Sequence, residues 1–307
     1  MKTIAAVRDG WEDDGRMHST SGRYVGLLYL APALAFVVAF TALPVVQMLW
    51  MSLHNWSLIE PPKWVGFANY LRAYKDSQFW TSLRFTLTYT LYITPILMVG
   101  GFLIALLVAQ NSNLRRFTRA VVFVPVVIGL GASSLLWYYL FSYDFGMVNR
   151  IALDLGIVRK PVVWFGENVD RSLWAVIASI VWKVIGFGML LFVAAIQAIP
   201  SEINEAAVVD GASYWQRLRR ITLPLTARTI LLVTLFSVIG SLLAFDQFYL
   251  MTAGQPFNKT ATSVFFVYLN SFPYLKLGYG AALSTILATI VLTCTVAQLM
   301  VSRRSFG

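Results

Sequence analysis

With 307 residues the chain is long enough for one or two soluble domains, but 58% of its residues are hydrophobic and only 12% are charged. Soluble domains carry about 25% charged residues, so this chain could not cover a water-facing surface, whereas a bilayer accepts apolar side chains on the outside of a protein. The net charge of +10 does not indicate nucleic-acid binding, because lysine and arginine occur in short clusters between apolar stretches. Composition therefore predicts an integral membrane protein whose surroundings are lipid.

The first 24 residues are expected to form a cytoplasmic N-terminal tail. They include Arg8, Asp9 and Glu12 and lack the apolar core of a signal peptide. Residues 25–307 are expected to form one transmembrane domain. Its single cysteine, Cys294, has no partner thiol for a disulfide or a metal site.

Six apolar stretches follow the tail, each close to the 20 or so residues that a membrane-spanning helix needs. They cover residues 25–53, 83–109, 118–142, 173–197, 229–251 and 279–301. The sequence therefore predicts an all-α protein with about six transmembrane helices. Prolines at positions 32, 44, 95 and 125 lie within or near these stretches, where each one either kinks a helix or borders a cavity.

The distribution of lysine and arginine predicts the orientation. Arginines cluster in the tail at 16–23, at residues 115–119, at 217–228 and at 303–304, whereas the loops at 54–82, 143–172 and 252–278 mix both signs of charge. Short cytoplasmic loops carry the excess of basic residues, so we expect both termini in the cytoplasm. The three longer outer loops are rich in tryptophan and tyrosine, which is typical of residues at a membrane–water interface.

The segment 199–224, between the fourth and fifth stretches, is too polar to lie in lipid. Pro200 is expected to end a membrane helix and Ser201 to cap a short following helix. Ala206 and Ala207 favour helix, and Gly211 permits a turn that other residues resist. A second short helix with an arginine face then leads into the fifth stretch, so we expect a helix–turn–helix on the cytoplasmic side.

This segment resembles the EAA loop of ATP-binding-cassette (ABC) import permeases, in which Glu-Ala-Ala precedes a glycine and then Ile-x-Leu-Pro. Every fixed position of that pattern is met, by Glu205, Ala206, Ala207, Gly211, Ile221, Leu223 and Pro224. Further stretches resemble the carbohydrate-uptake branch, of the kind that moves maltose or glycerol-3-phosphate. They are residues 29–33, 64–70, 195–200, 210–212, 245–252 and 278–282. Residues 253–256 depart from the family, which usually has a run of glycines there.

The resemblance implies the type I ABC importer permease fold, in a bacterial or archaeal plasma membrane. It implies a second homologous permease subunit, a cytoplasmic ATPase dimer and an extracytoplasmic solute-binding protein, either periplasmic or a lipoprotein. The chain has no Gly-x-x-x-x-Gly-Lys-Ser/Thr loop, so it is expected to be no enzyme and to bind no cofactor, with ATP and Mg used by the separate ATPase. In the family this loop couples ATPase to permease, which assigns coupling roles to Glu205, Ala206, Ala207, Asp210 and Gly211. The competing interpretation is that Glu205 is only a charge near a helix end.

The substrate path is less clearly marked. Ionisable side chains at membrane depth are costly and point to function, which nominates Lys183 and Asp246. Matching by position to related permeases adds further candidates on the third to fifth helices, namely Gly129, Ser133, Phe187, Ser237, Ser241 and Gln247. These residues offer hydroxyl, amide, charged and aromatic partners for a sugar. Alternatively, the serines only allow close helix packing and Lys183 pairs with a neighbour.

Three other functions are alternatives to a sugar or polyol importer. A related permease for an amino acid, phosphonate or peptide would share the EAA loop. An ATP-independent secondary transporter predicts inverted repeats and paired acids within the membrane, neither of which is evident. A membrane enzyme would require a catalytic or metal-binding cluster, and His18 and His54 lie separately in a tail and a loop.

Overall fold

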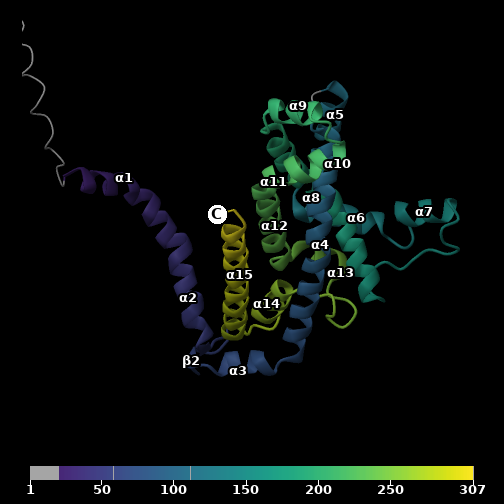
Figure 1. The fold of residues 1–307 in the computed structure, drawn as a ribbon. Coiled ribbons are helices and arrows are strands. Elements are labelled where there is room, and N and C mark those ends of the chain that lie inside the picture. Colours follow the sequence, from purple (N-terminus) through teal and green to yellow (C-terminus); the bar gives the residue numbers. More distant parts are fainter. Residues whose placement is uncertain (1–20, 58, 111, 307) are drawn as a thin grey trace, which may run out of the picture. The chain divides into compact units, whose positions relative to one another are not determined.

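The computed structural model describes residues 21–57, 59–110 and 112–306, and the side chains of residues 29–301 within those ranges. The chain divides into two units, residues 1–50 and 51–307. Figure 1 shows the elements in chain order. Most of the predicted tail, residues 1–20, lies outside the described part, and the first helix begins at Ser21, four residues earlier than expected.

The first unit consists of one apolar helical run with a local irregularity. Helix α1 (Ser21–Val37) continues through a π-helical turn, η1 (Val38–Ala42), into α2 (Leu43–Ser52). The π-turn comes immediately before Pro44, whose ring would clash with the carbonyl of Phe40 in a regular helix, so the wider turn accommodates the proline. Residues Tyr29–Ser52 are long and apolar enough to cross a bilayer.

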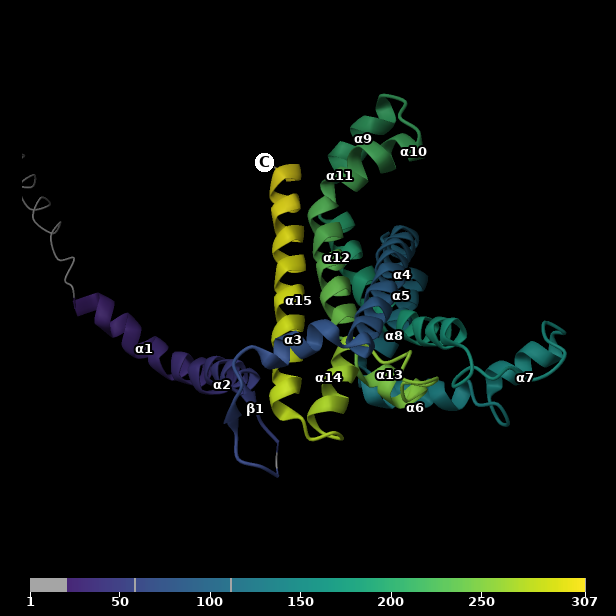
Figure 2. The same cartoon turned by 90° about the horizontal axis from the view of Figure 1, so that it is seen from below.

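The first elements of the second unit lie at one end of its helix bundle, and the 201–225 segment lies at the other end (Figure 1). Strands β1 (His54–Asn55) and β2 (Lys63–Trp64) form a short antiparallel ladder, and α3 (Ala68–Lys75) lies across the end of the bundle. The first half of the bundle then contains α4 (Ser77–Val108), α5 (Asn113–Val127), α6 (Leu130–Leu140), α7 (Met147–Asp154) and α8 (Val169–Gln197). Figure 2 shows α7 projecting away from these helices.

The second half of this unit starts with three short elements, α9 (Ser201–Val209), α10 (Tyr214–Arg217) and the π-turn η2 (Leu218–Thr222), followed by α11 (Leu223–Leu225). The chain returns through α12 (Ala227–Leu242), α13 (Asp246–Thr252), α14 (Ser263–Ser271) and α15 (Leu277–Phe306). Ala253, at the end of α13, has a left-handed φ of +48°. Glycine adopts that conformation without strain, which gives a physical reason for the glycines that the family usually has here.

The expected all-α membrane fold is confirmed, but two of the six expected spans are not continuous. Among the described residues, four helices are long and apolar enough to cross a membrane: Tyr29–Ser52, Ser77–Val108, Val169–Gln197 and Leu277–Val301. The expected span at 118–142 is wrong as one helix, because α5 and α6 meet at an angle of 99°. The expected span at 229–251 is likewise broken after Leu242, and α12 is itself joined to the preceding helical segment at a bend of 65°.

The core of the second unit forms where α4 packs along α8. Phe85, Tyr89 and Ile93 of α4 are at most 7% exposed, and they contact Val176 and Ile180 of α8 in the same apolar cluster. Pro95 lies inside α4 without ending it. Gly186 lets two backbones approach closely, because a Cβ atom on this residue of α8 would lie 2.3 Å from the carbonyl oxygen of Val122 in α5.

Gly186→Ala is therefore expected to destabilise the protein by about 1–3 kcal/mol, because α5 would have to move away from α8 to accept the methyl group. The control is Gly188→Ala on the same helix, where the new Cβ would make an ordinary 3.5 Å contact with a Val233 side chain. Thermal unfolding of the two detergent-solubilised variants measures the difference. Equal melting temperatures would contradict the close α5–α8 contact.

Candidate functional site: a polar hairpin and a central cavity

Residues 201–225 form the expected helix–turn–helix, which lies at one end of the second unit (Figure 1). Gly211 has a φ of +75°. Its N–H donates to the carbonyl of Val208, and the next N–H, from Ala212, donates to the carbonyl of Ala207 over 2.8 Å. This pair of bonds is a Schellman motif, which ends a helix on a left-handed glycine. The predicted conformational role of Gly211 is therefore confirmed.

The predicted capping role of Ser201 is wrong. Pro200 occupies the N-cap position of α9 without a side-chain cap, and Ser201 is the first helical residue. The capping serine is Ser213, at the start of the second limb: its Oγ accepts from the N–H of Gln216, and its own N–H donates to Gln216 Oε1 over 2.7 Å. Each limb therefore carries its own terminal hydrogen bonds, and we call residues 201–225 the hairpin.

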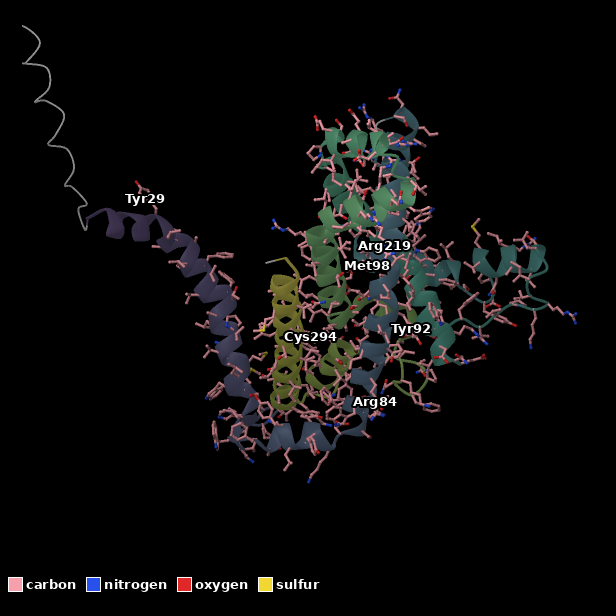
Figure 3. The ribbon with its side chains drawn as sticks, viewed as in Figure 1. Tyr29, Arg84, Tyr92, Met98, Arg219 and Cys294 are labelled. Atoms are coloured by element: carbon pink, nitrogen blue, oxygen red, sulfur yellow. The ribbon has the colours of Figure 1, made fainter. Side chains whose placement is uncertain are left out.

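The coupling residues nominated from the sequence gather on α9 and its turn. Glu205, Ala206 and Asp210 are exposed, whereas Ala207 is half-buried. Glu205 makes no ion pair with any residue in the described part of the chain. Large side chains are exposed nearby, with Val209 at 88% and Trp215 at 74%. Arg219 lies on the second limb (Figure 3). This surface combines apolar and charged groups that the chain itself leaves uncovered.

Hydrogen bonds tie the base of the hairpin to neighbouring helices. Gln197, the last residue of α8, donates to the carbonyl of Ala109 at the end of α4 over 2.7 Å. Arg119 of α5 donates to the carbonyls of Val108, Ala109 and Gln110. These side chains satisfy backbone carbonyls that a helix C-terminus leaves unpaired. The ends of α4, α5 and α8 are thus fixed to one another where the chain enters the hairpin.

A cavity of about 200 Å³ lies within the second unit, among α4, α6, α8, α12 and α13. Four of the nominated substrate-path residues line it: Ser237, Ser241, Asp246 and Gln247. Asp246 and Gln247 line the cavity because the helix is interrupted after α12: residues 243–245 are not helical, and α13 begins at Asp246 beside the cavity. Thr262 Oγ1 donates to the freed carbonyl of Ala244 over 2.6 Å.

Other residues lining the cavity were not nominated from the sequence. Tyr89, which is 2% exposed, interacts with the side chain of Gln247. Phe236, Gly240 and Phe245 add apolar surface. A tyrosine or phenylalanine within an apolar helix gives no sequence signal that separates cavity lining from packing. The cavity-lining role of Tyr89 is visible only in the structure, which shows that this residue of α4 lies beside Gln247.

The remaining four nominated residues do not line this cavity. Phe187 lines an adjoining cavity of about 60 Å³, which shares Leu97, Val184, Phe236 and Ser237 with the first. Ser133 Oγ donates to the carbonyl of Leu130 in its own helix. Gly129 precedes α6 at the break, beside Leu130, which does line the cavity.

Lys183 is 6% exposed, and its side chain forms hydrogen bonds at the break between α5 and α6. Its Nζ donates to the carbonyl of Ile128 over 2.6 Å and to that of Val126 over 3.3 Å. A bend of 99° removes the helical partners of these carbonyls, and an unpaired carbonyl within a membrane costs several kcal/mol. The ammonium group thus holds the bent pair, in agreement with the alternative that Lys183 pairs with a neighbour.

Comparison with known proteins agrees with this architecture. Residues 23–305 match the model of the family described as binding-protein-dependent transport system inner membrane component. The chain belongs to this family. It is 33% identical over 280 residues to the trehalose/maltose transport system permease protein MalF of Thermococcus litoralis, covering 91% of this chain and 94% of that one. It is 32% identical to the lactose transport system permease protein LacF of Rhizobium radiobacter, with coverage of 91% and 94%.

The fold also has a counterpart among solved structures. A chain of a bacterial ABC transporter involved in the import of the acidic polysaccharide alginate aligns with a TM-score of 0.80, at 23% identity, covering 94% of this chain and 98% of that one. The expected type I ABC importer permease fold is confirmed. The protein is therefore a multi-pass permease of the ABC-importer class.

Lys183→Met is expected to lower the stability of this permease by about 1–3 kcal/mol, because two buried carbonyls lose their donor. Lys160→Met, on an exposed loop, is the control for loss of one charge. Thermal unfolding in detergent measures both variants. An unchanged melting temperature for Lys183→Met, combined with altered solute selectivity, would instead place Lys183 in the substrate path.

Proposed function

We propose that the permease is one of two pore-forming subunits of an ATP-driven importer of sugars or related polyols, including glycerol phosphates. A separate ATPase dimer docks on the hairpin, and an extracytoplasmic binding protein delivers the solute from the opposite end. The relatives support the solute class: besides the trehalose/maltose and lactose permeases, the sulfoquinovosyl glycerol permease SmoG of Agrobacterium fabrum is 31% identical, with coverage of 92% of this chain and 91% of that one.

The observation that carries this proposal is the connection between the hairpin and the cavity. The hairpin begins directly after α8 and ends directly before α12. Both helices line the cavity, α8 through Ile180 and Val184 and α12 through residues 236–241. A displacement of the hairpin by a docked ATPase would pull on these two helices together. Since packed helices move as rigid elements, the displacement would reach the cavity walls.

The cavity chemistry fits a polyhydroxylated solute. The Asp246 carboxylate accepts hydrogen bonds, Gln247 both donates and accepts, and the hydroxyls of Tyr89 and Ser237 do the same. Phe236 and Phe245 offer apolar faces for the carbon skeleton of a sugar ring. A mostly apolar pocket with a few convergent polar groups is typical of small-molecule sites. In the complete pore, the second permease would supply the facing wall.

The hairpin end is proposed to face the cytoplasm, together with both termini. The basic residues Arg219, Arg220 and Arg228 lie on or beside the hairpin, and Arg115 and Arg116 belong to α5 at the same end of the bundle. Cytoplasmic loops carry this excess of positive charge. The opposite end, with α3 and the strand pair, would then meet the binding protein.

Glu205→Lys is expected to weaken association with the ATPase by about 30-fold, because reversing a charge that pairs with a basic group costs about 2 kcal/mol or more. Gly211→Pro is expected to uncouple hydrolysis from uptake, since proline cannot adopt a φ of +75°. The control is Asp144→Lys, an exposed charge reversal in the loop before α7. Pull-down of the ATPase and the ATP hydrolysed per solute imported are measured. Normal values for both variants would reject the coupling role.

Asp246→Asn and Tyr89→Phe are each expected to raise the KM for uptake about 5- to 100-fold, because the first replaces a charged acceptor with a neutral amide and the second removes a hydroxyl from the cavity. Ser133→Ala, outside the cavity, should leave the KM unchanged. Initial uptake rates of radiolabelled solute into proteoliposomes measure all three variants. An equal KM in all of them would remove the cavity from the solute path.

A further inference from the structure

A second and larger hollow lies between α12 and α15. These helices run side by side (Figures 1 and 2). The hollow has a volume of about 430 Å³, and its lining includes Leu231, Leu232, Leu235 and Leu299. We call it the α12–α15 groove. It is separate from the central cavity, with which it shares no lining residue.

Three polar side chains interrupt this apolar surface. Arg228, the second residue of α12, is exposed and is the only charged residue among those that line the groove. Gln298 of α15 has a buried Oε1 atom that accepts no hydrogen bond from any residue in the described part of the chain. A third polar group, the Thr234 hydroxyl, already donates to the carbonyl of Ile230 over 2.8 Å.

An unpaired buried acceptor is costly, and no donor for Gln298 Oε1 lies among the described side chains, which end at residue 301. A ligand of the groove that carries a donor would remove this cost. The groove therefore combines three requirements: an anion for Arg228, a hydrogen-bond donor for Gln298, and an alkyl chain for the leucines. An apolar helix of another subunit would satisfy only the last. It would also place hydrocarbon against the Arg228 guanidinium and leave Gln298 unpaired.

We propose that the α12–α15 groove binds an anionic glycerophospholipid whose headgroup carries hydroxyls, of the phosphatidylglycerol kind. One acyl chain lies along the leucines, the phosphate pairs with Arg228, and a headgroup hydroxyl donates to Gln298 Oε1. Arg228 is well placed to pair with the phosphate, because it is the second residue of α12 and the apolar residues of the groove follow it along the helix. Basic pockets between transmembrane helices are suited to anionic headgroups, to which each arginine or lysine contributes about 1 kcal/mol.

The test is native mass spectrometry of the full transporter complex, solubilised in a neutral detergent and titrated with defined lipids. Phosphatidylglycerol is compared with phosphatidylcholine, and with phosphatidylethanol, which keeps the negative charge but has no headgroup hydroxyl. The wild-type complex is expected to bind phosphatidylglycerol most tightly. Arg228→Gln should weaken the binding of both anionic lipids about fivefold, whereas Gln298→Leu should weaken only the binding of phosphatidylglycerol.

Two further variants complete the design. Ala297→Phe places a bulky ring on the groove wall and should abolish the bound lipid while the complex stays assembled. Arg116→Gln, an exposed arginine of α5 away from the groove, should change nothing. Equal retention of phosphatidylcholine and phosphatidylglycerol, or no effect of Arg228→Gln, would overturn the proposal. A site-specific crosslink from position 232 to a helix of the second permease would also overturn it, because that helix would then occupy the groove.

Discussion

A membrane offers no water to a broken helix, so every backbone group that a bend releases has to find a partner within the protein. This constraint shapes the centre of the permease. At the break between α5 and α6, Lys183 donates to the carbonyls of Val126 and Ile128. At the break after α12, Thr262 donates to the carbonyl of Ala244. Because both breaks are satisfied by side chains from other elements, the bent helices hold a defined shape, and the cavity lies between them.

The two breaks also explain how polar groups reach the cavity. A straight helix through residues 229–251 would place Asp246 and Gln247 beyond the cavity, further along the helix axis. The turn at residues 243–245 instead brings α13 back toward α4, where Gln247 meets Tyr89. A cavity with hydrogen-bonding groups in its wall is thus assembled from otherwise apolar helices by a change in backbone direction, with few polar residues.

The membrane class was predictable from overall composition, and the positions of the apolar helices were predictable from the runs of apolar residues along the chain. The breaks were not predictable, since apolar residues continue through Ile128 and Leu243 and a hydropathy window does not register backbone direction. The rule that charges at membrane depth are functional found Lys183 and Asp246 together, but only contacts across helices separate a residue that supports a bend from one that lines a cavity. In the hairpin, Gly211 was predictable because a left-handed turn selects glycine. The expected cap at Ser201 was wrong because Pro200 occupies the N-cap position of α9. The cap at Ser213 starts the second limb, and its spacing to Gln216 fits the capping-box pattern.

The hairpin holds its own shape through the Schellman bonds around Gly211 and the reciprocal bonds of Ser213 and Gln216. A segment that is already folded loses little conformational entropy when another protein binds it, so most of the contact energy remains available for affinity. Binding and release at this surface then require no local refolding. If the proposed ATPase docks here, its rate of association depends on diffusion and charge more than on rearrangement of the permease.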